Sequence, residues 1–246
     1  MNTTIAAGAL ALALAAGTAS AGATGAIIGG SALLDAGKAD QLGRWLGAGD
    51  INLRNVYTRK PGDNSLAFHG AADAKGPTFT LLEVSNPAGS TYLVGGYDPQ
   101  SWSSSGGWHE TPLDWQRSAF LFNMSAPAVY RQIPSTYVLP SQGLRQTFND
   151  ASLGPVFGSG PDLYVDDKLT GSISWQVSYG NPGEEGLSII DRSRGGENVR
   201  VDALEIFAVS PVPEPARMVM LLLGAGVLAS RVGVRRLRRA TAAATR

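Results

Sequence analysis

Short apolar runs, each bounded by turn residues, set the strongest constraint on the fold of this chain. The sequence holds 31 Gly and 14 Pro in 246 residues, and few of its segments have the spacing of an amphipathic helix. Such runs, separated by Gly, Pro and Asn, predict β-strands. The expected strands cover residues 66–68, 78–84, 91–95, 119–123, 136–139, 163–165, 172–179 and 199–209.

The pattern within these runs predicts the fold class. Residues 172–179 alternate throughout between two side-chain faces, which predicts a strand with one buried and one wet face. About eight short strands predict a mainly β (α+β) fold, a two-layer antiparallel β-sandwich with flanking short helices. One helix is expected from a Ser31 cap to Leu46, ended by Gly47 and packed on the sheet.

The N-terminus has the pattern of a signal peptide. Residues 5–16 are apolar, and Ala19-Ser20-Ala21 offers the small residues that a signal peptidase accepts before its cut. We expect cleavage after Ala21, so that residues 1–21 are the signal peptide and 22–30 a linker. The pattern is atypical because no Lys or Arg precedes Lys38, and an Ala-rich terminus on a cytoplasmic protein is the alternative.

The C-terminus has the pattern of a membrane anchor. Residues 218–230 are 13 uncharged residues, which as a helix are roughly 20 Å long against a hydrocarbon core of about 30 Å. Arginines at both ends can extend this segment to the interfaces, so residues 217–234 are expected to form a transmembrane helix. The basic tail, residues 235–246, is expected on the cytoplasmic side, held there by Arg235, Arg236, Arg238 and Arg239.

A short motif precedes this anchor. Val212-Pro213-Glu214-Pro215 lies within residues 211–216, and the two prolines prevent a helix from continuing backward into the preceding domain. The order of motif, apolar helix and arginine cluster resembles the PEP-CTERM sorting signal. The resemblance implies processing by an exosortase, a membrane-embedded cysteine protease, and delivery to the cell surface or an extracellular matrix. An ordinary single-pass anchor is the alternative.

The tail conceals the charge of the domain that precedes it. Seven of the 20 basic residues lie beyond Pro215, whereas 19 of the 20 acidic residues lie before Val212. The domain therefore carries a net charge near −6, which argues against nucleic acid as a partner.

Motifs in the central region carry a second resemblance. The positions that carry it, in order along residues 31–210, are Phe68, His69, Asp73, Gly76, Pro77, Gly95, Gly96, Trp102, Phe120, Phe122, Gly158, Asp162 and Glu205. They resemble the TLDc domain, the TLD module of eukaryotic oxidation-resistance proteins. This resemblance implies a β-sandwich with flanking helices and a binding or protective role without an established catalytic mechanism. Its eukaryotic members are associated with binding the vacuolar proton pump, a partner that an exported bacterial domain would not meet.

The chain offers little catalytic chemistry. It has no Cys, no G-x-S-x-G motif and two histidines, of which His69 is expected to be structural rather than a catalytic base and His109 solvated. The acid pairs Asp166-Asp167 and Glu184-Glu185 are interpreted as solvated turns. A calcium site made by Asp162 with the first pair is the alternative. We therefore expect no catalytic, cofactor or metal site.

Three tryptophans lie close together in the sequence. Trp102, Trp108 and Trp115 would suit a sugar-stacking platform, although the preferred interpretation places Trp102 in the core and the others at the sandwich edge.

The combined expectation is an exported surface or matrix protein with a TLDc-like binding or protective domain. Its processing partners would be signal peptidase and exosortase, its anchor the inner membrane, and its ligand an exopolysaccharide or envelope protein. The alternative is an extracellular hydrolase acting on a matrix polysaccharide, which requires a cleft with convergent carboxylates of raised pKa.

Overall fold

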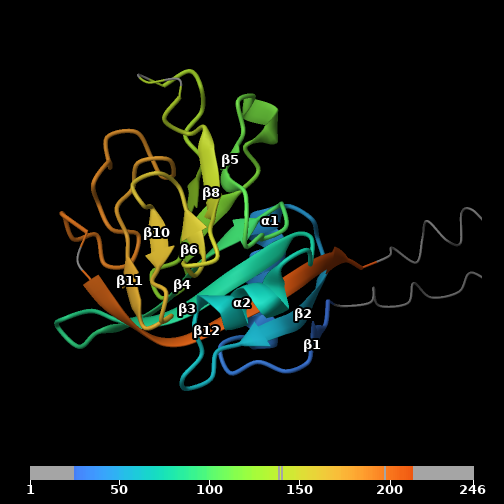
Figure 1. The fold of residues 1–246 in the computed structure, drawn as a ribbon. Coiled ribbons are helices and arrows are strands. Elements are labelled where there is room, and N and C mark those ends of the chain that lie inside the picture. Colours follow the sequence, from blue (N-terminus) through green and yellow to red (C-terminus); the bar gives the residue numbers. More distant parts are fainter. Residues whose placement is uncertain (1–24, 138, 140, 197, 213–246) are drawn as a thin grey trace, which may run out of the picture. The chain divides into compact units, whose positions relative to one another are not determined.

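In the computed structural model, which describes residues 25–212 except 138, 140 and 197, the chain builds a sheet of 12 strands flanked by two α-helices (Figure 1). The mainly β prediction is confirmed. All strand pairs are antiparallel except β1 with β2. The elements in order are β1 (Ile27–Ile28), α1 (Ala36–Leu46), β2 (Ile51–Thr58), α2 (Ser65–Ala72), β3 (Thr78–Ser85), β4 (Thr91–Asp98), β5 (Gly107–Glu110), the 3-10 helix η1 (Asp114–Gln116), β6 (Phe120–Asn123), β7 (Ala128–Arg131), β8 (Arg145–Asn149), β9 (Val156–Phe157), β10 (Leu163–Val165), β11 (Gly171–Ile173) and β12 (Asn198–Pro211).

The 14-residue strand β12 forks the sheet. One of its edges pairs with β3 along residues 200–208, while the opposite edge pairs first with β11 at 198–200 and then with β2 at 205–211. Strands β11, β10, β9, β8 and β5 therefore form one arm, and β2 with β1 forms another. Backbone groups between the two arms lose their strand partner and need another one.

Arg59, directly after β2, fills this fork. Its guanidinium donates to the carbonyl of Leu169 at 2.7 Å and to those of Val201 and Asp202 at 3.1 and 2.7 Å. The pairing of β12 with β3 shifts register between Val201 and Ala203, at the same place. A planar guanidinium with several fixed N–H groups can satisfy carbonyls that two diverging strands leave unpaired.

The arm that starts at β11 folds back over the central strands. Phe157 of β9 packs on Gly96 of β4, where an added Cβ would lie 2.7 Å from the tip of the Phe157 ring. Trp102 meets the same ring edge-on at 5.3 Å, and its indole N–H donates to Thr78 Oγ1. One buried cluster thus combines residues of β3, β4, β6 and α2 with residues of β9 and β10.

Helix α1 covers the opposite face of the central strands. Its Leu42 is fully buried in a second cluster with Leu53 of β2 and with the aromatic side chains Phe79, Phe120 and Phe122. Asp35 caps the helix by accepting from the N–H of Lys38. Gly47 ends it in the left-handed conformation, and this end is the one that the sequence predicts. The two helices therefore lie on opposite faces of the central strands, α2 against one cluster and α1 against the other.

Four local predictions are wrong. Residues 66–68 belong to helix α2, because Asn64 caps the N–H groups of Leu66 and Ala67. Residues 136 and 137, in the expected strand 136–139, form a turn and a bend, and residues 174–179 of the expected strand 172–179 lie in a loop after β11. Ser31 does not cap α1, since Asp35 does. Short strands β1, β5, β7 and β9 and the longer β2 and β8 have no counterpart among the expected strands.

The expected membrane segments fall outside the described residues. The signal peptide with Ala19 and Ala21, residues 213–216, the helix 217–234 and the arginine cluster all lie there. Within residues 25–212, no helix has the length and apolar character needed to cross a membrane.

The described domain begins and ends at neighbouring positions. Pro211 of β12 pairs with Ile51 of β2, and the N–H of Val212 donates to the carbonyl of Asp50. Gly25 also lies against Ile51, because an added Cβ at Gly25 would be 2.0 Å from the Ile51 carbonyl oxygen. The entry and the exit of the domain thus both lie beside the first residue of β2.

The Gly96 contact predicts a stability change. Gly96→Ala should destabilise the domain by about 1–3 kcal/mol, because its methyl group would overlap Phe157 and Leu121. The matched control is Gly70→Ala on α2, where an added Cβ meets nothing within 4 Å and should stabilise by about 0.5–1 kcal/mol. Denaturant unfolding of both variants checks this, and equal effects would contradict the packing of β9 on β4.

Candidate functional site

A hollow beside strand β8 is the candidate site. Its volume is about 590 Å³, within the range typical of small-molecule sites. Strands β5 and β8 contribute one wall, and the segments around residues 137–144, 159 and 177–185 contribute the rest. The residues that line this hollow, called the β8 hollow below, are Glu110, Tyr137, Leu139, Ser141, Gln142, Leu144, Arg145, Ser159, Val177 and Glu185.

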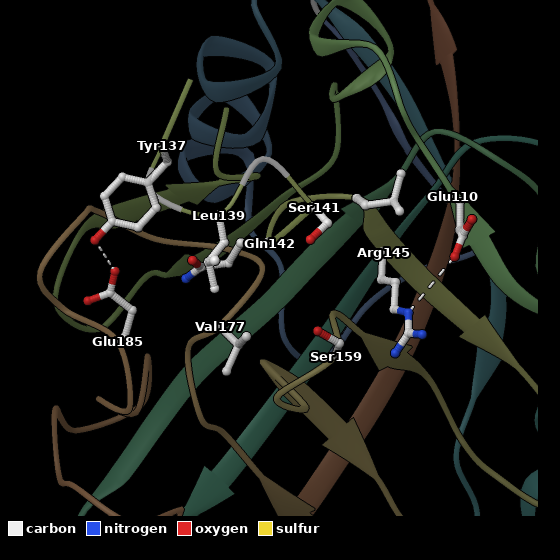
Figure 2. Close-up of a pocket in the computed structure, with 10 residues that line it drawn as sticks. Glu110, Tyr137, Leu139, Ser141, Gln142, Arg145, Ser159, Val177 and Glu185 are labelled. Atoms are coloured by element: carbon white, nitrogen blue, oxygen red, sulfur yellow. Dashed lines mark hydrogen bonds and ion pairs between the residues drawn. The ribbon is translucent and has the colours of Figure 1, made fainter. Parts of the chain in front are cut away.

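Two polar pairs lie at opposite sides of the β8 hollow (Figure 2). On one side the Tyr137 hydroxyl donates to the Glu185 carboxylate. On the other side, Arg145 Nε lies 3.9 Å from Glu110 Oε1. Figure 2 shows Val177 and Ser159 between these pairs. The hollow thus has a polar pair on each side and a mixed surface between them, to which Val177 contributes an aliphatic group and Ser159 a hydroxyl group.

Arg145 is also fixed from behind. Its guanidinium lies over the Trp108 ring at 4.8 Å from the ring centroid, and Trp108 in turn packs against Phe148 at 4.8 Å. A guanidinium held on an aromatic face and beside a carboxylate loses little further freedom when it binds a ligand.

The charges of the hollow have partners within it. The hydrogen bond from Tyr137 is the main cause that lowers the pKa of Glu185, and the same bond raises the pKa of the Tyr137 hydroxyl. At neutral pH the carboxylate is therefore ionised and the phenol protonated. Glu110 faces Arg145, whereas Glu185 keeps its negative charge beside a neutral hydroxyl, so the lining holds two carboxylates against one guanidinium.

The Asp162 carboxylate shapes the segment that contributes Val177. Its Oδ1 accepts the backbone N–H groups of Val177, Ser178 and Tyr179 at 2.7–2.8 Å. Asp162 is fully buried, and burial raises its pKa to about 7 against the effect of these donors. A Cβ at Gly158 would lie 1.9 Å from Asp162 Oδ2, so this position needs glycine, whose φ here is +68°.

These contacts exclude the calcium alternative in this arrangement. Asp162 points at N–H donors rather than toward Asp166 and Asp167, and Asp166 accepts the Thr170 N–H in the turn between β10 and β11. The turn interpretation of the acid pairs agrees with their exposed or half-buried surfaces. Among residues 25–212 as described, no group of three or more His, Asp or Glu is placed to hold a metal ion.

His69 is a structural residue, as the sequence indicates. It lies on helix α2 and is buried, with Nδ1 2.7 Å from Asp73 Oδ1 and Nε2 2.9 Å from the Asp150 carbonyl. Asp73 also accepts the N–H of Ser104 at 2.6 Å. Both ring nitrogens have partners, so His69 ties α2 to two loops and has no free nitrogen for a substrate.

The tryptophans do not form a common platform. Trp102 is 1% exposed and lies in the core, as the preferred interpretation expected, while Trp115 on η1 is 78% exposed. Trp108 is half-buried beneath Arg145 and contributes to the support of the β8 hollow. The hypothesis of a sugar-stacking platform made by all three rings is therefore wrong.

The other family-motif positions also support the fold. Glu205 is 2% exposed and accepts from Ser31 Oγ at 2.5 Å and from the Ala32 N–H at 2.9 Å, which fixes the segment before α1 on β12. None of the motif positions lines the β8 hollow. Phe68, Gly95, Gly96, Phe120 and Phe122 lie in or against the core, Gly76 has a φ of +78° and is followed by Pro77, and Gly158 faces Asp162.

Sequence reasoning missed the residues that line the hollow. Tyr137 and Leu139 were expected in a strand, Glu185 in a solvated turn, and Arg145 carried no prediction. A signal existed in the Pro- and Ser-rich stretch of residues 134–141, because long irregular segments with aromatic residues often carry binding sites.

Comparison with known proteins adds no assignment: no family model matches the chain, and no curated protein matches it.

Asp162 predicts a large stability effect. Asp162→Ala should cost about 3 kcal/mol, because it leaves several buried N–H groups without an acceptor. The matched control is Asp167→Ala, an exposed aspartate five residues away, which should change stability by about 0.5 kcal/mol or less. Denaturant unfolding monitors both variants, and similar losses would show that the carboxylate does not hold the loop.

The buried carboxyl group of Asp98 predicts that the free energy of unfolding depends on pH. Burial raises its pKa to about 7 from an ordinary 3.8, so between these pH values the folded state keeps a proton that the unfolded state has lost. The contribution of Asp98 to the free energy of unfolding therefore rises as pH falls from 7 toward 4. Asp98→Asn removes this titration, and its stability should depend on pH with a slope that differs by about one proton. Identical slopes for the two proteins would refute the assignment.

Proposed function

We propose that the chain is an exported cell-surface or matrix protein whose domain binds a ligand and whose tail is a PEP-CTERM signal processed by an exosortase. The observation that carries the proposal is the position of the motif. The compact unit ends at Val212, the first residue of Val212-Pro213-Glu214-Pro215, directly after β12. A processing signal at the end of the last strand can be removed without loss of any strand of the domain.

We further propose that the domain is a TLDc-like sandwich. The packing of β9 on β4 supports two layers, and α1 and α2 on opposite faces correspond to flanking helices. The motif positions Phe68, His69, Asp73 and Trp102 support it too, since they meet around α2 and the loop after β4.

A binding role fits the β8 hollow better than hydrolysis. A glycosidase of the usual kind needs a carboxylic acid of raised pKa beside the scissile bond. In the hollow, the pKa of Glu185 is lowered by its Tyr137 hydrogen bond. The described carboxylates with pKa raised to about 7, Asp98 and Asp162, are buried in the interior and do not line the hollow.

The proposed partners follow from this role. Signal peptidase and exosortase would process the two ends, the 217–234 segment would hold the precursor in the inner membrane, and the ligand would be an exopolysaccharide or an envelope protein.

The sorting proposal predicts a change in size and location. In the native host, the chain with a peptide tag inserted after Gly22 should appear as a shortened species at the cell surface or outside the cell. Changing Pro213, Glu214 and Pro215 to alanine should leave the full-length species in the inner-membrane fraction. Immunoblots of cell fractions measure both.

The control is Pro87→Ala, which changes a proline in the exposed β3–β4 turn and should be processed normally. The sorting proposal fails if the triple alanine variant has the same size and location as the unaltered chain.

A further inference from the structure

We propose that the β8 hollow binds an uncharged carbohydrate segment. This inference deepens the proposed binding role and rests on it. It is carried by the chemistry, the charge and the surrounding hydrogen bonds of the ten lining residues.

The lining offers the groups that a polyhydroxylated ligand needs. Tyr137, Ser141 and Ser159 bring hydroxyl groups, and Gln142 brings an amide, so donors and acceptors both face the hollow. Carboxylates and a guanidinium lie at its two ends, where Figure 2 shows Glu185 and Arg145. Sugar hydroxyl groups both donate and accept, which matches such a mixed set.

The lining also contains apolar groups. Leu139, Leu144 and Val177 contribute to it together with the Tyr137 ring. The C–H faces of sugar rings are apolar and pack against aliphatic and aromatic surface, while their edges carry the hydroxyl groups. A hollow that combines polar groups with aliphatic and aromatic surface therefore fits a short run of sugar units.

The charge of the lining disfavours an anionic ligand. It holds two carboxylates, Glu110 and Glu185, against the guanidinium of Arg145, which already faces Glu110. A phosphate or a uronic acid would therefore meet a net negative charge, whereas a neutral hydroxyl would not.

The hydrogen bonding of the walls disfavours an extended peptide. Peptides that bind to sheets add a strand to a free edge. Strand β8 is paired on both edges, by β5 and by β9, and the N–H of Val177 is bonded to Asp162. Strand β8 and the Val177 segment thus offer the hollow side chains rather than a free backbone edge.

The side chains that line the hollow are also held in place before a ligand binds. Asp162 fixes the segment of Val177, and Trp108 supports Arg145 from behind. Groups that are already held in place lose less freedom on binding, so weak individual contacts still give specific recognition.

The test is direct titration of the full chain, purified in a polyoxyethylene detergent that carries no sugar headgroup. The probes are cellohexaose, laminarihexaose, maltohexaose and mannohexaose, with hexagalacturonate as the charged comparison. Calorimetry and tryptophan fluorescence should both show saturable binding of at least one neutral hexasaccharide below about 1 mM, a binding free energy beyond about −4 kcal/mol. Hexagalacturonate should bind more weakly.

Two variants locate the site. Tyr137→Phe removes one hydroxyl group and should weaken binding about tenfold, and Val177→Trp should fill the middle of the hollow and abolish it. The matched control is Tyr92→Phe on β4, which does not line the hollow and should bind like the unaltered chain. Thermal unfolding verifies that each variant is folded, and Tyr137→Phe remains informative if Val177→Trp does not fold.

Three results would overturn the inference: no binding of any neutral hexasaccharide, tighter binding of hexagalacturonate, or equal affinity in Tyr137→Phe and Tyr92→Phe. None of them affects the sorting proposal, because a chain that is processed and exported normally but binds no neutral sugar has lost only its carbohydrate assignment.

Discussion

The buried carboxylate of Asp162 is the interaction on which both the closure of the sheet and the β8 hollow depend. It has no cationic partner among its hydrogen bonds, and it is stabilised by backbone N–H groups of residues 177–179. The loop that it shapes then bonds to the far end of the sheet, because Ser178 accepts from the Ile133 N–H and Gly180 donates to the Arg131 carbonyl. A carboxylate without a counter-ion is costly to bury, so its N–H donors must all stay in place.

The fork of β12 supplies the other half of this arrangement. Because β11 and β2 share one edge of β12, the arm from β11 to β5 is free to turn over the central strands. Arg59 keeps the fork satisfied, and Phe157 meets the flat surface that Gly96 provides. The loop held by Asp162 then joins this arm to β7. Local choices at four residues thus allow one hydrogen-bonded sheet to fold its β11–β5 arm back over the central strands.

The sequence predicts strands correctly where buried apolar side chains and backbone pairing with a neighbouring strand fall on the same residues. The expected strands 78–84, 91–95, 163–165 and 199–209 all form, because their apolar residues pack in a core while their backbones pair. Residues 172–179 alternate in burial, but the polar side chains of Ser172, Ser174, Gln176 and Ser178 are the buried ones and Trp175 is 44% exposed. Beyond Ile173 the N–H groups turn to Asp162 and other loop partners rather than to a neighbouring strand. Alternation indicates two faces, and it reports neither which face is buried nor which acceptor the backbone will find.

The candidate site was less accessible to sequence reasoning for a related reason. Its residues come from loops and from two strands separated by tens of positions, and most are polar residues that resemble solvated turns in the sequence. Their role in the site depends on contacts that only the fold creates, such as the hydrogen bond between Tyr137 and Glu185.

The meeting of Gly25, Ile51 and Val212 at one point has a mechanical consequence. A pull on the two ends acts on the short β1 and on the last pairs of β12 with β2, and not across the two buried clusters. Under load, the hydrogen bonds at this point open one after another, and the two buried clusters carry little tension. A domain whose two ends meet in this way can be held by either end, or by both, while the regions far from these ends keep their shape.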